Sequence, residues 1–260
     1  MRVRDRMAHR FLMANTGATG LLLAVGLLVC VAFAAAAGPQ AAAERACANA
    51  AADPDTQIRG CTEVLQQSSV SDNHGRAWAY TNRGTAYARK GDTDSAIKDY
   101  DKAIWLRPLL LLDIAHYYRG AAHAQKGDYQ RAIRDYDEAG KLKRNTAAYQ
   151  NARCWIRAVS NRDLMTALDL CNLALSLAPK SAATLDSRGF VYFRMGDMTK
   201  ARADYDAALA LTPKAAGSLF MRGVVRRRGG DTAAGDADIA AALTIDANVQ
   251  TTYGLYGVTP

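Results

Sequence analysis

The sequence has few residues that break helices and few that bind metals. Six prolines and 20 glycines among 260 residues are too few for the many turns of a β-sandwich, so an α-helical protein is favoured. Only four histidines are present, and His116 and His123 stand where the repeats described below elsewhere carry tyrosine. We therefore expect both to pack rather than to bind metal, and we predict no metal and no cofactor.

The overall composition excludes several classes of protein. Hydrophobic residues make up 50% of the chain and charged residues 22%, which excludes a disordered chain, a collagen-like fibre and a multi-span membrane protein. The net charge is +8, and it falls to +5 without the first 37 residues, which carry four arginines and one aspartate. So small an excess argues against nucleic acid as a partner. Arg226 to Arg228 are expected to form a solvated helix face, with an anion site as the alternative.

The motifs of common enzyme sites are missing. The chain contains no G-x-S-x-G, no H-E-x-x-H and no G-x-x-x-x-G-K, which serve acyl transfer, zinc proteolysis and phosphate binding. Pairs of aspartates do occur in D-Y-D triplets, such as Asp99 to Asp101, but the triplet recurs along the chain. Recurrence at a fixed spacing is typical of structure rather than of an active site, so a non-enzymatic protein is predicted.

The N-terminus is typical of an export signal. Four arginines before position 11 precede an uncharged run from Leu21 to Ala37, and small residues follow it. Cleavage fits the A-x-A patterns at Ala34–Ala36 and Ala41–Ala43. The alternative is an uncleaved anchor, because residues 18–37 are long enough to span a bilayer. We predict an exported, periplasmic protein, or one held by this segment with its bulk outside.

A pattern of about 34 residues recurs five times. The marker is a glycine that in the first and fourth copies begins a G-x-x-Y motif, such as Gly84 to Tyr87, and in the third copy Trp155 takes the place of the glycine. The markers are Gly84, Gly120, Trp155, Gly189 and Gly223, at intervals of 36, 35, 34 and 34 residues. In each copy the apolar residues have helical spacing. A glycine (such as Gly91) stands where a first helix must end, and an aspartate (such as Asp92) follows where a second helix needs an N-cap. Stacked helical hairpins are therefore predicted.

This pattern resembles the tetratricopeptide repeat over residues 77–248. The resemblance implies an all-α, right-handed superhelical solenoid of antiparallel hairpins, with repeats at 77–110, 113–146, 148–181, 182–215 and 216–248. We expect residues 1–37 to be the signal or anchor. Residues 38–75 would form an N-terminal capping segment and loop: the cap is Ala43 to Gln67, in which Asp55 to Gln67 matches a second helix, and the loop is Ser68 to Gly75, which holds His74. Residues 249–260 would cover the last apolar face with Tyr253 and Tyr256.

Four cysteines lie outside the predicted signal, and an even number in an exported chain favours disulfides. Cys154 and Cys171 occupy positions 7 and 24 of the third repeat, which lie level across an antiparallel hairpin. Facing Cα atoms of packed helices are about 4–5.5 Å apart, within the range of a disulfide. Such a bond contributes about 3 kcal/mol. Cys47 and Cys61 flank a turn at Asp53-Pro54, and a disulfide is expected there too, with two buried thiols as the alternative.

The third repeat differs from the others by a correlated exchange. The others carry arginine at position 7 and aspartate at position 23, whereas the third has Cys154 and Leu170. We therefore predict an Arg–Asp pair inside each of the other hairpins, replaced in the third by the disulfide. If these pairs are exposed, each contributes at most about 1 kcal/mol and mainly sets the register of the two helices.

By the resemblance, the first helices line a concave groove that binds peptides or partner helices. Aromatic and arginine side chains anchor interfaces, so the expected groove residues are Trp78, Asn82, Arg89, Tyr117, Tyr118, Tyr149, Arg153, Phe190, Arg194 and Phe220. Packing between repeats is the alternative for each of them, and plain solvation for the arginines. The family's clamp for a chaperone's C-terminal carboxylate uses lysine and asparagine, where this chain has Thr81 and Thr85, then Tyr117 and Ala121. That partner is therefore disfavoured.

These observations favour a protein-interaction scaffold or adaptor of the cell envelope, with an acidic or aromatic-bearing segment as its partner. Two alternatives stay open: a membrane-anchored assembly factor, and a binder of an anionic envelope polymer.

Overall fold

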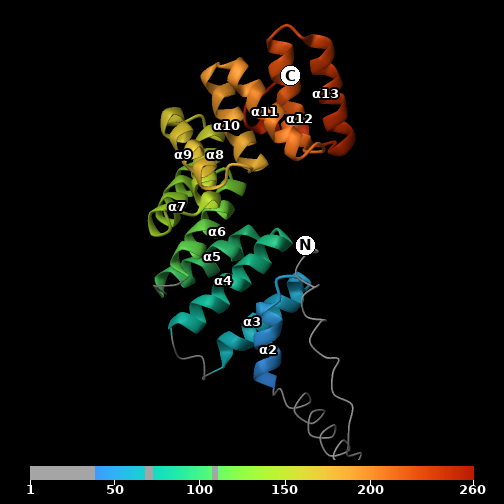
Figure 1. Ribbon diagram of the computed structural model, residues 1–260. Coiled ribbons are helices and arrows are strands. Elements are labelled where there is room, and N and C mark those ends of the chain that lie inside the picture. Colours follow the sequence, from blue (N-terminus) through green and yellow to red (C-terminus); the bar gives the residue numbers. More distant parts are fainter. Residues whose placement is uncertain (1–38, 68–72, 107–110) are drawn as a thin grey trace, which may run out of the picture. The chain divides into compact units, whose positions relative to one another are not determined.

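The computed structural model describes residues 39–67, 73–106 and 111–260, and every regular element in these ranges is an α-helix (Figure 1). The helices are α2 (Pro39–Ala48), α3 (Pro54–Gln66), α4 (Asn73–Lys90), α5 (Thr93–Trp105), α6 (Leu112–Gln125), α7 (Tyr129–Leu142), α8 (Ala147–Val159), α9 (Leu164–Leu177), α10 (Ala182–Met195), α11 (Met198–Leu211), α12 (Ala216–Arg228), α13 (Thr232–Ile245) and α14 (Val249–Leu255). The predicted signal or anchor lies outside these ranges. Within them, no helix is both long enough and apolar enough to cross a membrane.

The helices from α4 to α13 form five hairpins that stack in chain order. Each odd-numbered helix packs against the even-numbered helix before it, and each hairpin packs against the next. The all-helical, stacked-hairpin architecture predicted from the repeat is therefore confirmed. Buried side chains run through the stack, and the largest continuous core extends from Ala132 to Val258.

Short local signals end the first helices and begin the second. Gly91 has a φ of +85°, the left-handed conformation that glycine adopts without strain. Asp92 then accepts a hydrogen bond from the backbone N–H of Ser95 and caps α5. The predicted cap is absent at two hairpins. The side chains of Asp163 and Asp231 make no cap bond. In the third hairpin Asn161, with a φ of +51°, stands where Gly91 ends the first helix of the first hairpin, and Asp163 is also left-handed, with a φ of +45°.

The marker glycine allows the two helices of a hairpin to approach closely. A Cβ atom added to Gly84 would lie 2.8 Å from the Tyr100 ring, well inside van der Waals contact. Gly120 and Gly189 face Tyr136 and Tyr205 in the same way. In the third hairpin the tyrosine is replaced by Cys171 and the glycine by Trp155.

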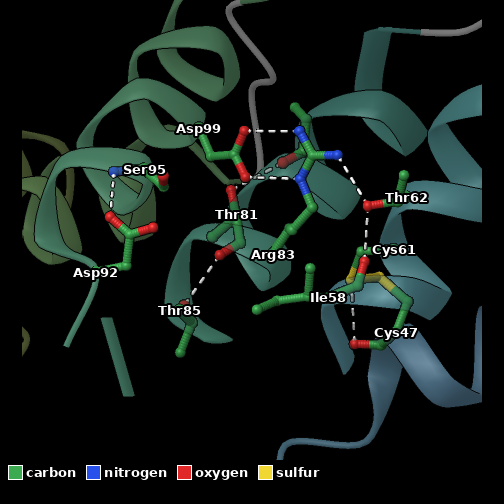
Figure 2. Close-up of polar contacts among 11 residues, drawn as sticks. Cys47, Ile58, Cys61, Thr62, Thr81, Arg83, Thr85, Asp92, Ser95 and Asp99 are labelled. Atoms are coloured by element: carbon green, nitrogen blue, oxygen red, sulfur yellow. Dashed lines mark hydrogen bonds and ion pairs between the residues drawn. A yellow bond between two sulfur atoms is a disulfide. The ribbon is translucent and has the colours of Figure 1, made fainter. Parts of the chain in front are cut away.

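Figure 2 shows the predicted Arg–Asp pair in the first hairpin. Arg83 donates from Nε and Nη2 to the two carboxylate oxygens of Asp99, at 2.7 and 2.9 Å. Its remaining Nη1 donates to Thr62 of α3, at 3.1 Å. One guanidinium therefore joins the first hairpin to the helix that precedes it. The same fork forms in three other hairpins, in the pairs Arg119–Asp135, Arg188–Asp204 and Arg222–Asp238.

Each of these three arginines also reaches the preceding hairpin. The partners there are Asp101, Asn172 and Asp206, at 2.7 to 3.0 Å. The D-Y-D triplet is thereby explained: its first aspartate binds the arginine of its own hairpin, its tyrosine packs under the marker glycine, and its second aspartate receives the next arginine. The four forked aspartates are only 4 to 7% exposed, so the limit of about 1 kcal/mol for exposed pairs does not apply to them.

Both predicted disulfides are present. The Cα atoms of Cys154 and Cys171 are 5.4 Å apart, and those of Cys47 and Cys61 are 4.5 Å apart. The Cys154–Cys171 bond links α8 to α9 in the third hairpin, which has no Arg–Asp fork. The second aspartate of the preceding triplet, Asp137, is there bound by Arg153 and Arg157 instead, each at 2.8 Å.

The segment before the first repeat contains two helices, α2 and α3, and the Cys47–Cys61 disulfide joins them. Asp53 caps α3 by accepting from the N–H of Thr56. The loop expected up to residue 75 ends earlier, because α4 begins at Asn73 and includes His74.

The fork predicts a large difference between two arginine substitutions. Arg188→Ala leaves Asp204 buried without its cation and also breaks the bond to Asn172, so the free energy of unfolding should fall by about 2–3 kcal/mol. Arg202→Ala removes only an exposed pair with Asp206, at 3.7 Å, and should change it by less than about 0.5 kcal/mol. Urea unfolding followed by circular dichroism measures both values, and equal losses would contradict the structural role of the fork.

Candidate functional site

The expected groove residues all lie on the first helices of the five hairpins. We call the surface formed by α4, α6, α8, α10 and α12 the first-helix face. Its two ends differ, because the C-terminal segment packs over α8, α10 and α12.

The C-terminal segment packs by its tyrosines. The Tyr253 ring of α14 stacks on Phe220 with ring centroids 5.4 Å apart, and its edge meets Phe190 at 5.9 Å. Tyr256 meets Trp155 at 5.8 Å. Tyr253 is 6% exposed and Val258 is 1% exposed, so residues near the end of the chain belong to the core.

Two arginines of the first-helix face bind the backbone of this segment. Arg194 donates to the carbonyl oxygen of Tyr256, and its guanidinium lies 5.0 Å from the centre of the Phe190 ring. Arg228 donates to the carbonyl oxygen of Thr259 at 3.4 Å and lies 4.5 Å over Phe193. The Arg226–Arg228 run is therefore not a uniformly solvated face.

These contacts correct the expectation of an open groove along the whole repeat array. Phe190 and Phe220 are fully buried and Tyr149 is 9% exposed, so none of the three is a surface anchor in this arrangement. The tail was expected to cover the last apolar face. α14 packs on α12 and α13 of the last hairpin, and the two tyrosines also reach Trp155 of α8 and Phe190 of α10.

The face is different at α6, where Tyr118 is 37% exposed. Its ring lies 6.1 Å from that of Tyr100 and 5.5 Å from that of Tyr117, which in turn stacks on Tyr149 at 5.0 Å. Burial raises the pKa of Tyr100 to about 12 and also raises that of Tyr117. These hydroxyls are therefore neutral near pH 7, and the four rings form a rigid aromatic cluster with Tyr118 at its surface.

The other expected groove residues have local partners or partial burial. Trp78 packs against the cluster of buried residues that α2 and α3 form with Ala79 of α4, and Asn82 is half-buried. Arg89 donates to the side chain of Gln57 at 3.1 Å and to the carbonyl oxygen of Ala52 at 2.7 Å. Arg153 is paired with Asp137 and lies against Gly140.

The two histidines line a polar cleft of about 810 Å³ between α5, α6 and α7. His116 Nδ1 lies 3.0 Å from Asp135, and His123 is 7% exposed. Burial acts to raise the pKa of Asp135, but hydrogen bonds from His116 and Arg119 outweigh it and hold that pKa below its usual value. Acidic and basic side chains alternate around this cleft, and no group of side chains suited to a metal ion occurs in the described ranges.

One residue with an unusual environment escaped the sequence analysis. Asp186 lines a second cleft, of about 520 Å³, together with Trp155 and Tyr253. Burial raises the pKa of Asp186 to about 6, and only a hydrogen bond from Ser218 opposes the shift. The signal was available: Asp186 is the one acidic residue at position 5 of the repeats, where the other copies carry Thr81, Tyr117, Ala152 and Phe220.

Known sequences and structures agree with this geometry. Sequence models of the tetratricopeptide repeat match residues 77–108, 114–146 and 156–226. No curated protein matches the chain.

Several solved structures share the fold. MamA from Desulfovibrio magneticus is 20% identical, with 66% of this chain and 96% of that chain covered and a TM-score of 0.56. A tetratricopeptide repeat protein from Parabacteroides merdae is 20% identical, with 78% and 77% covered and a TM-score of 0.59. YrrB, described as a repeat protein of this kind with an unusual peptide-binding site, is 15% identical, with 77% and 100% covered and a TM-score of 0.54. At these identities the similarity shows the fold alone.

The packing of the tail predicts a contrast between two residues of α14. Tyr253→Ala removes a buried ring that contacts Phe190 and Phe220, and should lower the free energy of unfolding by about 3–4 kcal/mol. Leu255 is 78% exposed on the same helix, and Leu255→Ala should change it by less than about 0.5 kcal/mol. Thermal unfolding of both variants tests this, and a Tyr253 variant as stable as the unmodified chain would show that the tail does not belong to the core.

Proposed function

Because the chain belongs to the tetratricopeptide repeat family, whose repeats are typical of protein–protein interaction scaffolds, we propose that it is a non-enzymatic scaffold or adaptor of the cell envelope. It binds a peptide segment or a partner helix on the first-helix face of its N-terminal hairpins, around Tyr118.

The exposed ring of Tyr118 is the observation that carries this proposal. Tyr118 is 37% exposed, so part of its ring is accessible to a partner. Its contacts with the rings of Tyr100 and Tyr117 hold the side chain in place before binding. Little side-chain entropy is lost when such a residue binds, and aromatic anchors of this kind dominate binding energy. Asn82 and Trp78 lie on the adjacent first helix and extend the same surface.

The partner is a protein segment with an aromatic or acidic side chain. Tyrosine hydroxyls and the half-buried Asn82 amide offer hydrogen bonds, but no lysine stands at the two positions of the family's carboxylate clamp, which here hold Thr81 and Tyr117. The affinity expected of such a surface is about 1 μM. The buried residues Phe190 and Phe220 take part only if the C-terminal segment leaves them.

In this proposal the five hairpins from α4 to α13 form the binding module. Residues 43–67 and 249–260 close its two ends, and residues 1–37 are the export signal.

The two disulfides support an exported location. Disulfides persist in oxidising compartments such as the bacterial periplasm and are rare in the cytosol, and both cysteine pairs here are bonded. The alternative is a membrane-anchored assembly factor, in which the segment 18–37 stays attached.

A binder of an anionic envelope polymer is the other alternative, and the structure favours it less. The cationic groups Arg131, Arg134 and Lys141 line the cleft between α5, α6 and α7, but four acidic residues line it with them. Binding of a polyanion would weaken steeply with salt, whereas peptide binding at aromatic residues would weaken little.

The test of peptide binding compares two exposed aromatic residues. Tyr118→Ala should weaken binding of selected ten-residue peptides by at least about tenfold, because it removes the anchor. Trp105 is 78% exposed on α5, a second helix, and Trp105→Ala should leave binding unchanged. Peptides are selected on an array with the unmodified chain, and affinities are measured by fluorescence anisotropy. Equal binding by the Tyr118 variant would place the site elsewhere.

Export is tested by the intact mass of the protein purified from its host's envelope fraction without reduction. The expected mass lacks the first 36–43 residues and is lower by the four hydrogens lost in two disulfides. A full-length mass would support the anchored alternative, and free thiols would contradict the oxidising compartment.

A further inference from the structure

The cleft that contains Asp186 has the dimensions of a binding site. It has a volume of about 520 Å³ and is lined by residues of three first helices: Asn151 and Trp155 from α8, Asp186 from α10 and Ser218 from α12. Tyr253 of α14 forms one side of it. Volumes of this size are typical of sites for small ligands or single side chains.

The cleft contains a carboxylate and an amide oxygen that have no cation beside them in the part of the chain that the structure describes. The Ser218 hydroxyl donates to Asp186 Oδ1, and no arginine, lysine or histidine in the described ranges forms an ion pair with that carboxylate. Asp99 and Asp204, which are buried on second helices, are each bound by an arginine fork, whereas Asp186 stands on a first helix outside these forks. The side-chain oxygen of Asn151 is also buried and has no hydrogen-bond partner. A buried oxygen without a donor is costly, and a carboxylate with a single hydroxyl donor can still accept further hydrogen bonds.

Aromatic rings stand beside these acceptors. Trp155 and Tyr253 both line the cleft, and Gly217 admits the Tyr253 hydroxyl so closely that a Cβ there would lie 2.8 Å from it. Ring faces attract cations, and a carboxylate beside them supplies the opposite charge. A primary ammonium brings three donors and one positive charge, which complements this set of groups.

We propose that the cleft between α8, α10, α12 and Tyr253 binds an organic ammonium group, carried by a small free amine or by a lysine side chain, with Asp186 as its counter-ion. Asn151 accepts a further hydrogen bond, and Trp155 and Tyr253 cover the alkyl chain. The site differs from the peptide surface at Tyr118 and does not depend on it.

The test uses the full chain and three probes. Cadaverine represents the free amine, Nα-acetyl-lysine methylamide represents the side chain, and Nα-acetyl-norleucine methylamide has nearly the same shape without the charge. Binding is measured by calorimetry with the unmodified chain, with Asp186→Asn and with Asp169→Asn. Asp169 is an exposed aspartate on α9, so its variant makes the same charge change outside the cleft.

We expect at least one amine to bind and the norleucine probe to bind at least about tenfold more weakly. Asp186→Asn should weaken amine binding by at least about tenfold, and Asp169→Asn should leave it unchanged. Binding of cadaverine alone would identify a free amine as the ligand, and binding of the lysine probe alone would identify a side chain. The proposal is overturned if neither amine binds at about 10 mM, if norleucine binds equally, or if Asp186→Asn has no effect.

A second readout needs no variant. In the unmodified, isotope-labelled chain, the amine that binds should shift the backbone amide signals of Ser187, Ser218 and Tyr253, and shifts confined to other hairpins would contradict the site. Tyr118→Ala should leave amine binding intact. Failure of peptide binding and failure of the ammonium site are therefore separate results.

Discussion

The rest of the structure depends on one interaction, the guanidinium that is forked onto a buried carboxylate of its own hairpin and bonded to the hairpin before it. Arg188 binds Asp204 and Asn172 in this way, and Arg222 binds Asp238 and Asp206. A single planar group with five donors therefore sets both the register of two helices and the spacing of two hairpins. Because the carboxylates are nearly buried, water cannot readily replace the arginine as their hydrogen-bond partner. The forks therefore hold the first helices at regular positions on one face.

The third hairpin shows what replaces this interaction. Cys154 and Cys171 make the link between the two helices covalent, and Arg153 with Arg157 takes over the bond to the preceding hairpin. The third repeat also has no tyrosine to pack under the marker position, because Cys171 takes its place. The marker position itself holds Trp155 instead of glycine. Trp155 in turn contacts Phe190 and Tyr256. The exchange in one hairpin is thus linked to the aromatic surface on which the C-terminal segment packs.

The first-helix face is consequently divided into regions with different chemistry. Around Tyr118 it offers a supported aromatic ring to a partner. Around Phe190 and Phe220 it is filled by the chain's own tyrosines. Between α8, α10, α12 and Tyr253 lies the cleft that contains the carboxylate of Asp186. A scaffold built from equal repeats thereby presents unequal sites, because position 5 of the repeat carries threonine, tyrosine, alanine, aspartate and phenylalanine in turn.

The sequence by itself determined the hairpins, the forks and both disulfides. The forks and the Cys154–Cys171 bond join residues 16 or 17 positions apart within one recurring unit, so helical periodicity places them level with each other. Cys47 and Cys61, 14 positions apart, flank a turn before the first repeat. Only the tertiary structure decided which groove residues are exposed. Arg194 meets Tyr256 across 62 residues, and Asp186 acquires its surroundings only where α8, α10, α12 and Tyr253 come together. Spacing along the chain carries no information about such contacts, because they arise from the packing of elements that are distant in sequence.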